Sequence, residues 1–141
     1  MKWIIPIIFI WAGFILSISF FESWVKFKAA GITMPVALSI GKLIFTVLNR
    51  IEWVFVLLLC GCFYFFNISA PRSVLYLLAI IGVILLVQTF WLLPVLNARA
   101  VSQINGKEVA ASNLHMWFVI LEFFKLIFLL LSGTKFLQTL N

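Results

Sequence analysis

Four long apolar segments, separated by short polar stretches, dominate the pattern of the chain. They predict helices over residues 3–28, 36–66, 73–96 and 114–136. Each segment is at least as long as the roughly 20 residues that cross a bilayer as a helix. The segments are continuously apolar rather than alternating, which argues against a transmembrane barrel. The pattern therefore predicts an all-α integral membrane protein, a four-helix transmembrane bundle with short loops.

Nothing in the sequence divides this bundle into separate parts. The chain contains no internal repeat, low-complexity tract or linker, so residues 1–141 are expected to form a single transmembrane domain. The first apolar segment is longer than the roughly 7–15 residues of a signal-peptide core, and no small-x-small cleavage site follows it. We therefore expect the first segment to be a transmembrane helix of the protein.

Composition excludes an ordinary soluble domain, because 65% of the residues are hydrophobic and only 10% are charged. The lipid bilayer is the expected partner. The net charge of +6 comes mostly from residues at the ends of the apolar segments, where it directs membrane topology. Nucleic acid is therefore not an expected partner. Cys60 and Cys62 lie two apart on one helix and point away from each other, so neither a disulfide nor a zinc site is expected between them.

The apolar segments nevertheless carry polar and ionisable side chains well inside their length. Asn49, Arg50 and Glu52 lie in the second segment, and Glu122 and Lys125 lie in the fourth. On insertion scales a central charged residue costs roughly 2.5–3.5 kcal/mol, whereas each Leu, Ile or Phe returns about 0.3–0.6 kcal/mol. Such residues are therefore expected to face the interior of the bundle and to pair with one another.

The polar residues are also expected to share one depth and one face of the bundle. Four antiparallel helices place both termini at one end and the connections at 28–43 and 97–113 at the other. The polar residues fall in the half of the bundle near these connections. Their spacings of three, four and seven residues put them on one stripe per helix. The predicted ligand-binding residues are Glu22, Asn49, Arg50, Glu52, Arg99, His115, Glu122 and Lys125.

This cluster predicts a site that binds, and by extension transports, a small ion or polar metabolite. One alternative is a non-catalytic membrane assembly or scaffold subunit whose salt bridges are structural. Another is a membrane-embedded enzyme that acts on a lipid or quinone head group, with Glu52 or Glu122 as the proton carrier. The sequence contains no hydrolase triad, nucleotide-binding loop or dinucleotide fingerprint. It leaves open whether the protein is an enzyme and which cofactor, if any, it uses.

Metal and haem sites find little support in the pattern. No Glu-x-x-His pair occurs, so a carboxylate-bridged di-metal centre is not expected. The single histidine supplies one axial haem ligand, and only a symmetric dimer would supply two. The main prediction is that the site holds no metal. The alternative is a metal held between helices, by His115 with Glu22 or by Glu52 with Glu122.

Oligomeric state and orientation follow from surface pattern and charge. A homodimer is predicted because four short helices enclose a charged site poorly, and Gly82 on the third helix allows close helix contact. The end with the two longer connections has five basic residues: Lys26, Lys28, Lys42, Arg99 and Lys107. The opposite end has three: Lys2, Arg72 and Lys135. The positive-inside rule therefore predicts a plasma (inner) membrane protein with both termini on the extracytoplasmic side.

Overall fold

The computed structural model describes residues 3–26, 28, 31–110 and 112–139, without the side chains of Glu22, Ser23 and Lys26. Within these residues every regular element is helical, and two of the elements, η1 and η2, are π-helical. The elements are α1 (Ile4–Ile15), η1 (Leu16–Glu22), α2 (Ser23–Lys26), α3 (Met34–Phe65), α4 (Arg72–Val87), η2 (Gln88–Leu92), α5 (Leu93–Ile104) and α6 (Leu114–Gln138).

Four helical segments of the described chain are long and apolar enough to cross a membrane. They are Ile4–Phe21, Met34–Phe65, Arg72–Ile104 and Leu114–Gln138. The predictions of an all-helical protein and of four long apolar helices are confirmed.

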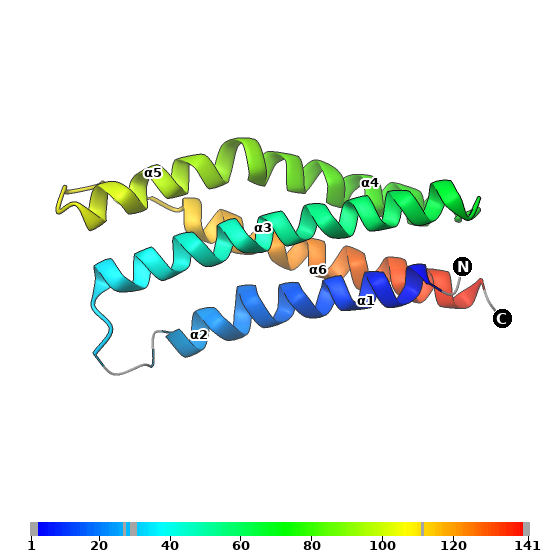
Figure 1. Cartoon of the computed structure of the whole chain (residues 1–141), viewed down its shortest axis with the longest axis horizontal. Coiled ribbons are helices and arrows are strands. Elements are labelled where there is room, and N and C mark those ends of the chain that lie inside the picture. The colour runs from blue at the N-terminus through cyan, green and yellow to red at the C-terminus, as the bar shows by residue number, and fades with distance from the viewer. Residues whose placement is uncertain (1–2, 27, 29–30, 111, 140–141) are drawn as a thin grey trace.

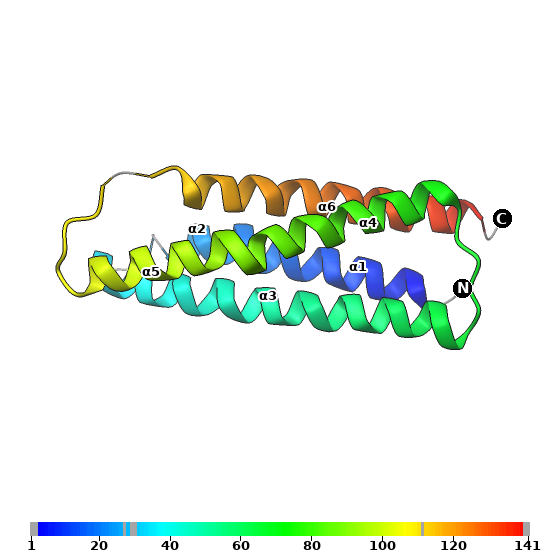
Figure 2. The same ribbon diagram turned by 90° about the horizontal axis from the view of Figure 1, so that it is seen from above.

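The helices run alternately up and down, so both termini lie at one end of the bundle and the α2–α3 and α5–α6 connections lie at the other (Figures 1 and 2). Helix α6 packs against α1 and α4, while α3 packs against α1 and α5. Each long helix therefore has two neighbours, and the four helices enclose a common interior.

Helix α3 is the longest continuous α-helix and spans 32 residues, or about 48 Å at 1.5 Å per residue. Pro35 lies in its first turn, where a missing N–H leaves no hydrogen bond unmade. After the helix ends at Phe65, Asn67 adopts a left-handed backbone conformation with φ 45°, and α4 begins at Arg72. The predicted bounds of 36–66 differ from these by two residues or fewer.

The third helix does not end at residue 96 as predicted but continues to Ile104. Pro94 lacks an N–H, and its ring would clash with the carbonyl of Phe90 in a regular α-helix. The chain is π-helical over Gln88–Leu92, directly before this proline, and the wider turn accommodates it. Figure 1 shows the resulting bend between α4 and α5. The connection that follows is consequently short, from residue 105 to 113, and turns at Gly106 with φ 76°.

Two other predicted helices differ from the structure in smaller ways. The first helix is a sequence of α1, η1 and α2, so a π-helical stretch interrupts the single helix predicted over 3–28. The last helix ends at Gln138 rather than at residue 136.

Two apolar clusters form the core. The terminal cluster lies toward the termini and includes Ile4, Ile8, Trp11, Ile15, Phe55, Leu59, Ile81, Leu129 and Phe136. The loop-end cluster is smaller and consists of Phe45, Leu92, Leu93 and Phe118. Along α3, α4–η2 and α6, the residues between these two clusters are mostly polar where they face the interior.

Candidate functional site

A layer of polar side chains separates the two apolar clusters. Asn49, Glu52, Gln88, Glu122 and Lys125 are all buried, with at most 4% of each residue exposed. Thr89 and Trp53 are partly buried beside them. These seven residues are called the polar layer below. Asn49 with Glu52, and Glu122 with Lys125, are each three residues apart, so each pair shares one face of its helix.

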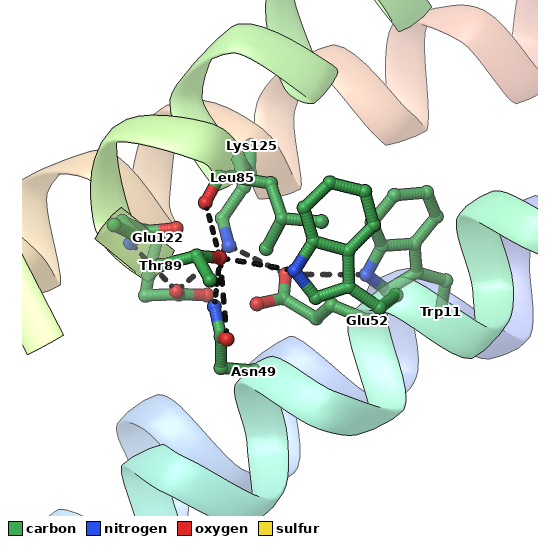
Figure 3. Close-up of polar contacts among 9 residues, drawn as sticks. Trp11, Asn49, Glu52, Leu85, Thr89, Glu122 and Lys125 are labelled. Carbon is green, nitrogen blue, oxygen red and sulfur yellow. Dashed lines mark hydrogen bonds and ion pairs between the residues drawn. The ribbon is translucent and has the colours of Figure 1, made fainter.

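Lys125 lies between two glutamates at the centre of the layer. Its Nζ donates to Glu52 Oε1 at 2.5 Å and lies 2.8 Å from Glu122 Oε1. None of the three side chains has any exposed surface. Glu52 comes from α3 and the other two from α6, so this ion-pair triad joins the two helices through the interior (Figure 3).

Two neutral donors complete the surroundings of the same carboxylate oxygens. The indole N–H of Trp11 donates to Glu52 Oε1 at 3.3 Å, and Gln88 Nε2 donates to Glu122 Oε1 at 2.9 Å. Trp11 comes from α1 and Gln88 opens η2, so all four helical segments contribute to the site. Donors therefore converge on one oxygen of each carboxylate.

Thr89 organises a second group of hydrogen bonds beside the triad (Figure 3). Its hydroxyl accepts hydrogen bonds from Asn49 Nδ2 and Trp53 Nε1, both at 3.0 Å. It lies 2.7 Å from the Leu85 carbonyl and 3.2 Å from Asn49 Oδ1. A hydroxyl has a single hydrogen, so it donates to one of these oxygens at a time. Thr89 thus ties α3 to the π-helical turn.

The other carboxylate oxygens of the triad have no hydrogen-bond partner within the described residues. These oxygens are Glu52 Oε2 and Glu122 Oε2, and Gln88 Oε1 also has no hydrogen-bond partner among these residues. Buried polar atoms are ordinarily paired, and an unpaired one costs free energy. With all three groups ionised, the two glutamates and one lysine sum to a net charge of −1 in an apolar interior. Both observations indicate that the site can accept one additional positive charge.

The structure separates the predicted site residues into different places. Asn49, Glu52, Glu122 and Lys125 come together in the polar layer. Arg50 does not join them, because it is exposed on the outer side of α3. Its position one residue after Asn49 turns it about 100° away around a helix of 3.6 residues per turn.

Two more predicted residues lie beyond the loop-end cluster. Arg99 donates to the Ala110 carbonyl and so holds the α5–α6 connection, while the His115 ring packs 5.4 Å from that of Phe45. Both line a cavity at the loop end of the bundle rather than the polar layer. The reason is depth, since Arg99 lies eleven residues beyond Gln88 on a continuous helix and His115 seven residues before Glu122. The side chain of Glu22 lies outside the described residues.

Sequence reasoning did not select Thr89, Gln88, Trp11 and Trp53 as site residues. Gln88 and Thr89 form the only polar pair in the apolar run from 74 to 93, which is a usable signal. The tryptophans carried no such signal, because tryptophan is common in packing and at membrane interfaces.

The polar layer offers little to a metal ion. The described residues contain no group of three or more His, Cys, Asp and Glu side chains that could hold one. His115 lines the loop-end cavity, and Glu52 and Glu122 both bind Lys125. The arrangement is instead suited to holding a proton or a small monovalent ion against two carboxylates.

Comparisons with known proteins found no match among protein-family models, curated proteins or solved structures. The chemistry of the site therefore has to be derived from its own geometry.

Proposed function

We propose that the chain is an integral membrane protein with a single transmembrane domain over 1–141, and that it binds a small cation at Glu52, Glu122 and Lys125. A proton is the cation that suits this site best. The observation that carries the proposal is a fully buried triad of two glutamates and one lysine, in which two carboxylate oxygens have no partner among the described residues.

Membrane insertion is supported by the inverted distribution of polarity. The interior holds the charged triad, whereas large apolar side chains lie on the outside of the bundle, such as Leu57, Val83 and Phe90, which are 59–75% exposed. Exposing such an apolar surface to water is unfavourable, whereas exposing it to lipid tails is not. Arg50 on the outside of α3 can lay its apolar stem along the helix and extend its guanidinium toward the head groups.

The need for one more positive charge follows from electrostatics. An uncompensated charge in a low-dielectric interior costs several kcal/mol even after relaxation. One Lys balances one Glu, and a second cation balances the other. A metal ion needs several oxygen ligands at once, and two carboxylates already bound to a lysine supply few. A proton needs a single carboxylate oxygen, and each of the two glutamates has one oxygen without a partner among the described residues.

The site is a binding site rather than an open pore. The terminal cluster and the loop-end cluster flank the polar layer on either side along the bundle. Transport of the cation, or of a polar metabolite coupled to it, would require both clusters to open in turn. The loop-end cluster is the thinner barrier, because it contains four buried residues among those that the structure describes, whereas the terminal cluster contains eleven.

We further propose the location and assembly that the sequence predicts. The protein lies in a plasma (inner) membrane with both termini on the extracytoplasmic side, and it forms a homodimer. The aliphatic face of α4 supports a dimer, because Ile80, Val83 and Leu86 are exposed there and Gly82 has no described heavy atom within 4 Å of an added Cβ.

Thermal unfolding in detergent with lithium, sodium, potassium or choline chloride at one ionic strength tests which cation binds. With a proton as the balancing charge, the four salts give wild-type protein the same unfolding midpoint, and E52Q and E122Q fold normally. A midpoint raised by one alkali ion in the wild type but not in E52Q would assign that ion instead of the proton. If neither E52Q nor E122Q folds, the triad is structural and the binding proposal is wrong.

A further inference from the structure

A second site lies at the loop end of the bundle, beyond the loop-end cluster. It is a cavity of about 260 Å³ between α3, α5, the α5–α6 connection and the start of α6. Its floor is apolar and includes Phe45, Leu93 and Leu96. Phe45 also belongs to the loop-end cluster, so this layer closes the cavity off from the polar layer.

Three basic side chains, Lys42, Arg99 and His115, line the cavity, and no acidic residue is among the lining residues that the structure describes. Glu108 lies in a neighbouring depression together with Lys107. Asn97, Gln103 and Ser112 add neutral hydrogen-bonding groups to the lining. An apolar floor below a basic, hydrogen-bonding rim is complementary to an amphiphile with an anionic head.

The walls of the cavity are held by contacts of their own. Arg99 donates to the Ala110 carbonyl and fixes the connection against α5. Asn97 Nδ2 donates to Thr46 Oγ1 at 3.4 Å and joins α5 to α3. The ring of Phe45 packs 4.8 Å from that of Phe118. A site formed in advance by such contacts binds its ligand with less loss of conformational freedom.

We propose that this cavity binds an anionic phospholipid, with the phosphate at Lys42, Arg99 and His115 and the first acyl carbons against Phe45, Leu93 and Leu96. The volume is below the roughly 300–1,000 Å³ that encloses a whole drug-sized ligand, so it suits one end of a longer molecule. Basic groups where helices leave the hydrocarbon are the usual partners of anionic head groups. The inference rests on the proposed membrane location and is independent of the cation at the polar layer.

Native mass spectrometry of the purified protein with equal amounts of phosphatidylglycerol and phosphatidylcholine tests the site. The wild type should retain phosphatidylglycerol preferentially. K42Q should weaken that retention by about tenfold, which corresponds to 1.4 kcal/mol. R99K should also weaken it, because lysine keeps the charge but loses the planar fork that binds phosphate and the Ala110 carbonyl.

Two controls remove the same charge elsewhere. R50Q acts on the outside of α3 and R72Q at the opposite end of the bundle, and both should retain phosphatidylglycerol as the wild type does. Lys42 is only half-buried, so K42Q should keep the unfolding midpoint of the wild type. Equal loss in K42Q and R72Q would show general surface attraction and overturn the proposal.

Inorganic phosphate separates a lipid site from a phosphate site. It should fail to displace phosphatidylglycerol, because it has no apolar part to bind the floor. Displacement at comparable concentrations would overturn the proposal in favour of free phosphate. Retention of both lipids alike by a protein that still requires detergent would refute this inference alone. A protein that stays soluble without detergent would instead refute the proposed membrane location.

Discussion

Among single residues, Lys125 sets the charge balance of the polar layer. Its ammonium group contacts Glu52 and Glu122 at once, at 2.5 and 2.8 Å, with no exposed surface on any of the three. Without a bound cation, the ionised triad carries −1; removing either glutamate charge then brings it to 0, whereas removing the lysine charge brings it to −2. Substitutions that each delete one charge should therefore have opposite consequences.

K125M should lower the free energy of unfolding by about 3–5 kcal/mol, because it leaves two buried carboxylates without their common partner. E122Q should leave that free energy unchanged or raise it, since Gln can still accept from Lys125 and Gln88. Equilibrium unfolding in mixed detergent micelles measures both. Equal losses in the two variants would contradict the proposed charge balance.

Thr89 is the second decisive residue, because its hydroxyl accepts hydrogen bonds from two N–H donors inside the bundle. T89V keeps the shape of the side chain but leaves Asn49 Nδ2 and Trp53 Nε1 without their acceptor. We expect T89V to lose about 1–3 kcal/mol of unfolding free energy, the cost of unsatisfied buried donors. T89S, which keeps the hydroxyl, is the matched control and should lose much less. A T89V protein as stable as T89S would show that these hydrogen bonds contribute little.

At the level of elements, the apolar pattern was sufficient to predict four long helices, and the bounds of α3 to within two residues. It placed the end of the third helix at residue 96, shortly after Pro94, because an interior proline kinks or ends a helix. The π-helical turn over Gln88–Leu92 lets the helix continue for another ten residues after Pro94. The same turn directs Gln88 and Thr89 toward the polar layer, as their bonds to Glu122 and Asn49 show. Whether a chain adopts this turn depends on tertiary packing, which a local pattern does not contain.

The contact between α1 and α6 depends on Gly133. A Cβ at this position would lie 2.8 Å from Phe9 Cζ and 2.9 Å from Phe9 Cε2. G133A should therefore lower the free energy of unfolding by about 1–3 kcal/mol through overpacking. Adding F9L, which shortens the opposing side chain, should recover most of the loss.

Gly13 provides the matched control on α1. An added Cβ there meets no described heavy atom within 4 Å. G13A should raise the free energy of unfolding by about 0.5–1 kcal/mol, as Gly to Ala does inside a helix. A double-mutant cycle over F9L and G133A measures the coupling, and purely additive effects would argue against the close contact.

For the whole molecule, the placement of the polar side chains could be predicted only in part, both in depth along the bundle and in lateral position. The termini lie at one end and the two longer connections at the other (Figures 1 and 2). The polar layer lies between the terminal cluster and the loop-end cluster. The sequence grouped Asn49, Glu52, Glu122 and Lys125 correctly by helix face. It could not separate them from Arg99 and His115, because the loop-end cluster that divides the two groups comes from residues on three helices.

Orientation is the prediction that belongs to this scale. Both termini at one end require that reporters fused before residue 1 and after residue 141 give the same result. The positive-inside rule predicts that alkaline phosphatase fused after residue 141 is active, and that a cytoplasmic reporter there is not. A reporter inserted after Gly106, in the α5–α6 connection, should give the opposite pattern. An inactive phosphatase at the C-terminus with an active one at Gly106 would reverse the orientation.

Infrared spectroscopy of the purified protein at neutral pH tests the proton at the triad most directly, because a protonated carboxyl group has a C=O stretching band separate from that of a carboxylate. We expect the wild type to show this band. E52Q and E122Q should each lose it, since either substitution brings the triad to neutrality with the remaining glutamate ionised against Lys125. E108Q, which alters an exposed glutamate in the α5–α6 connection, should keep it. A wild-type spectrum without the band, or a band that persists in both E52Q and E122Q, would contradict the proposal.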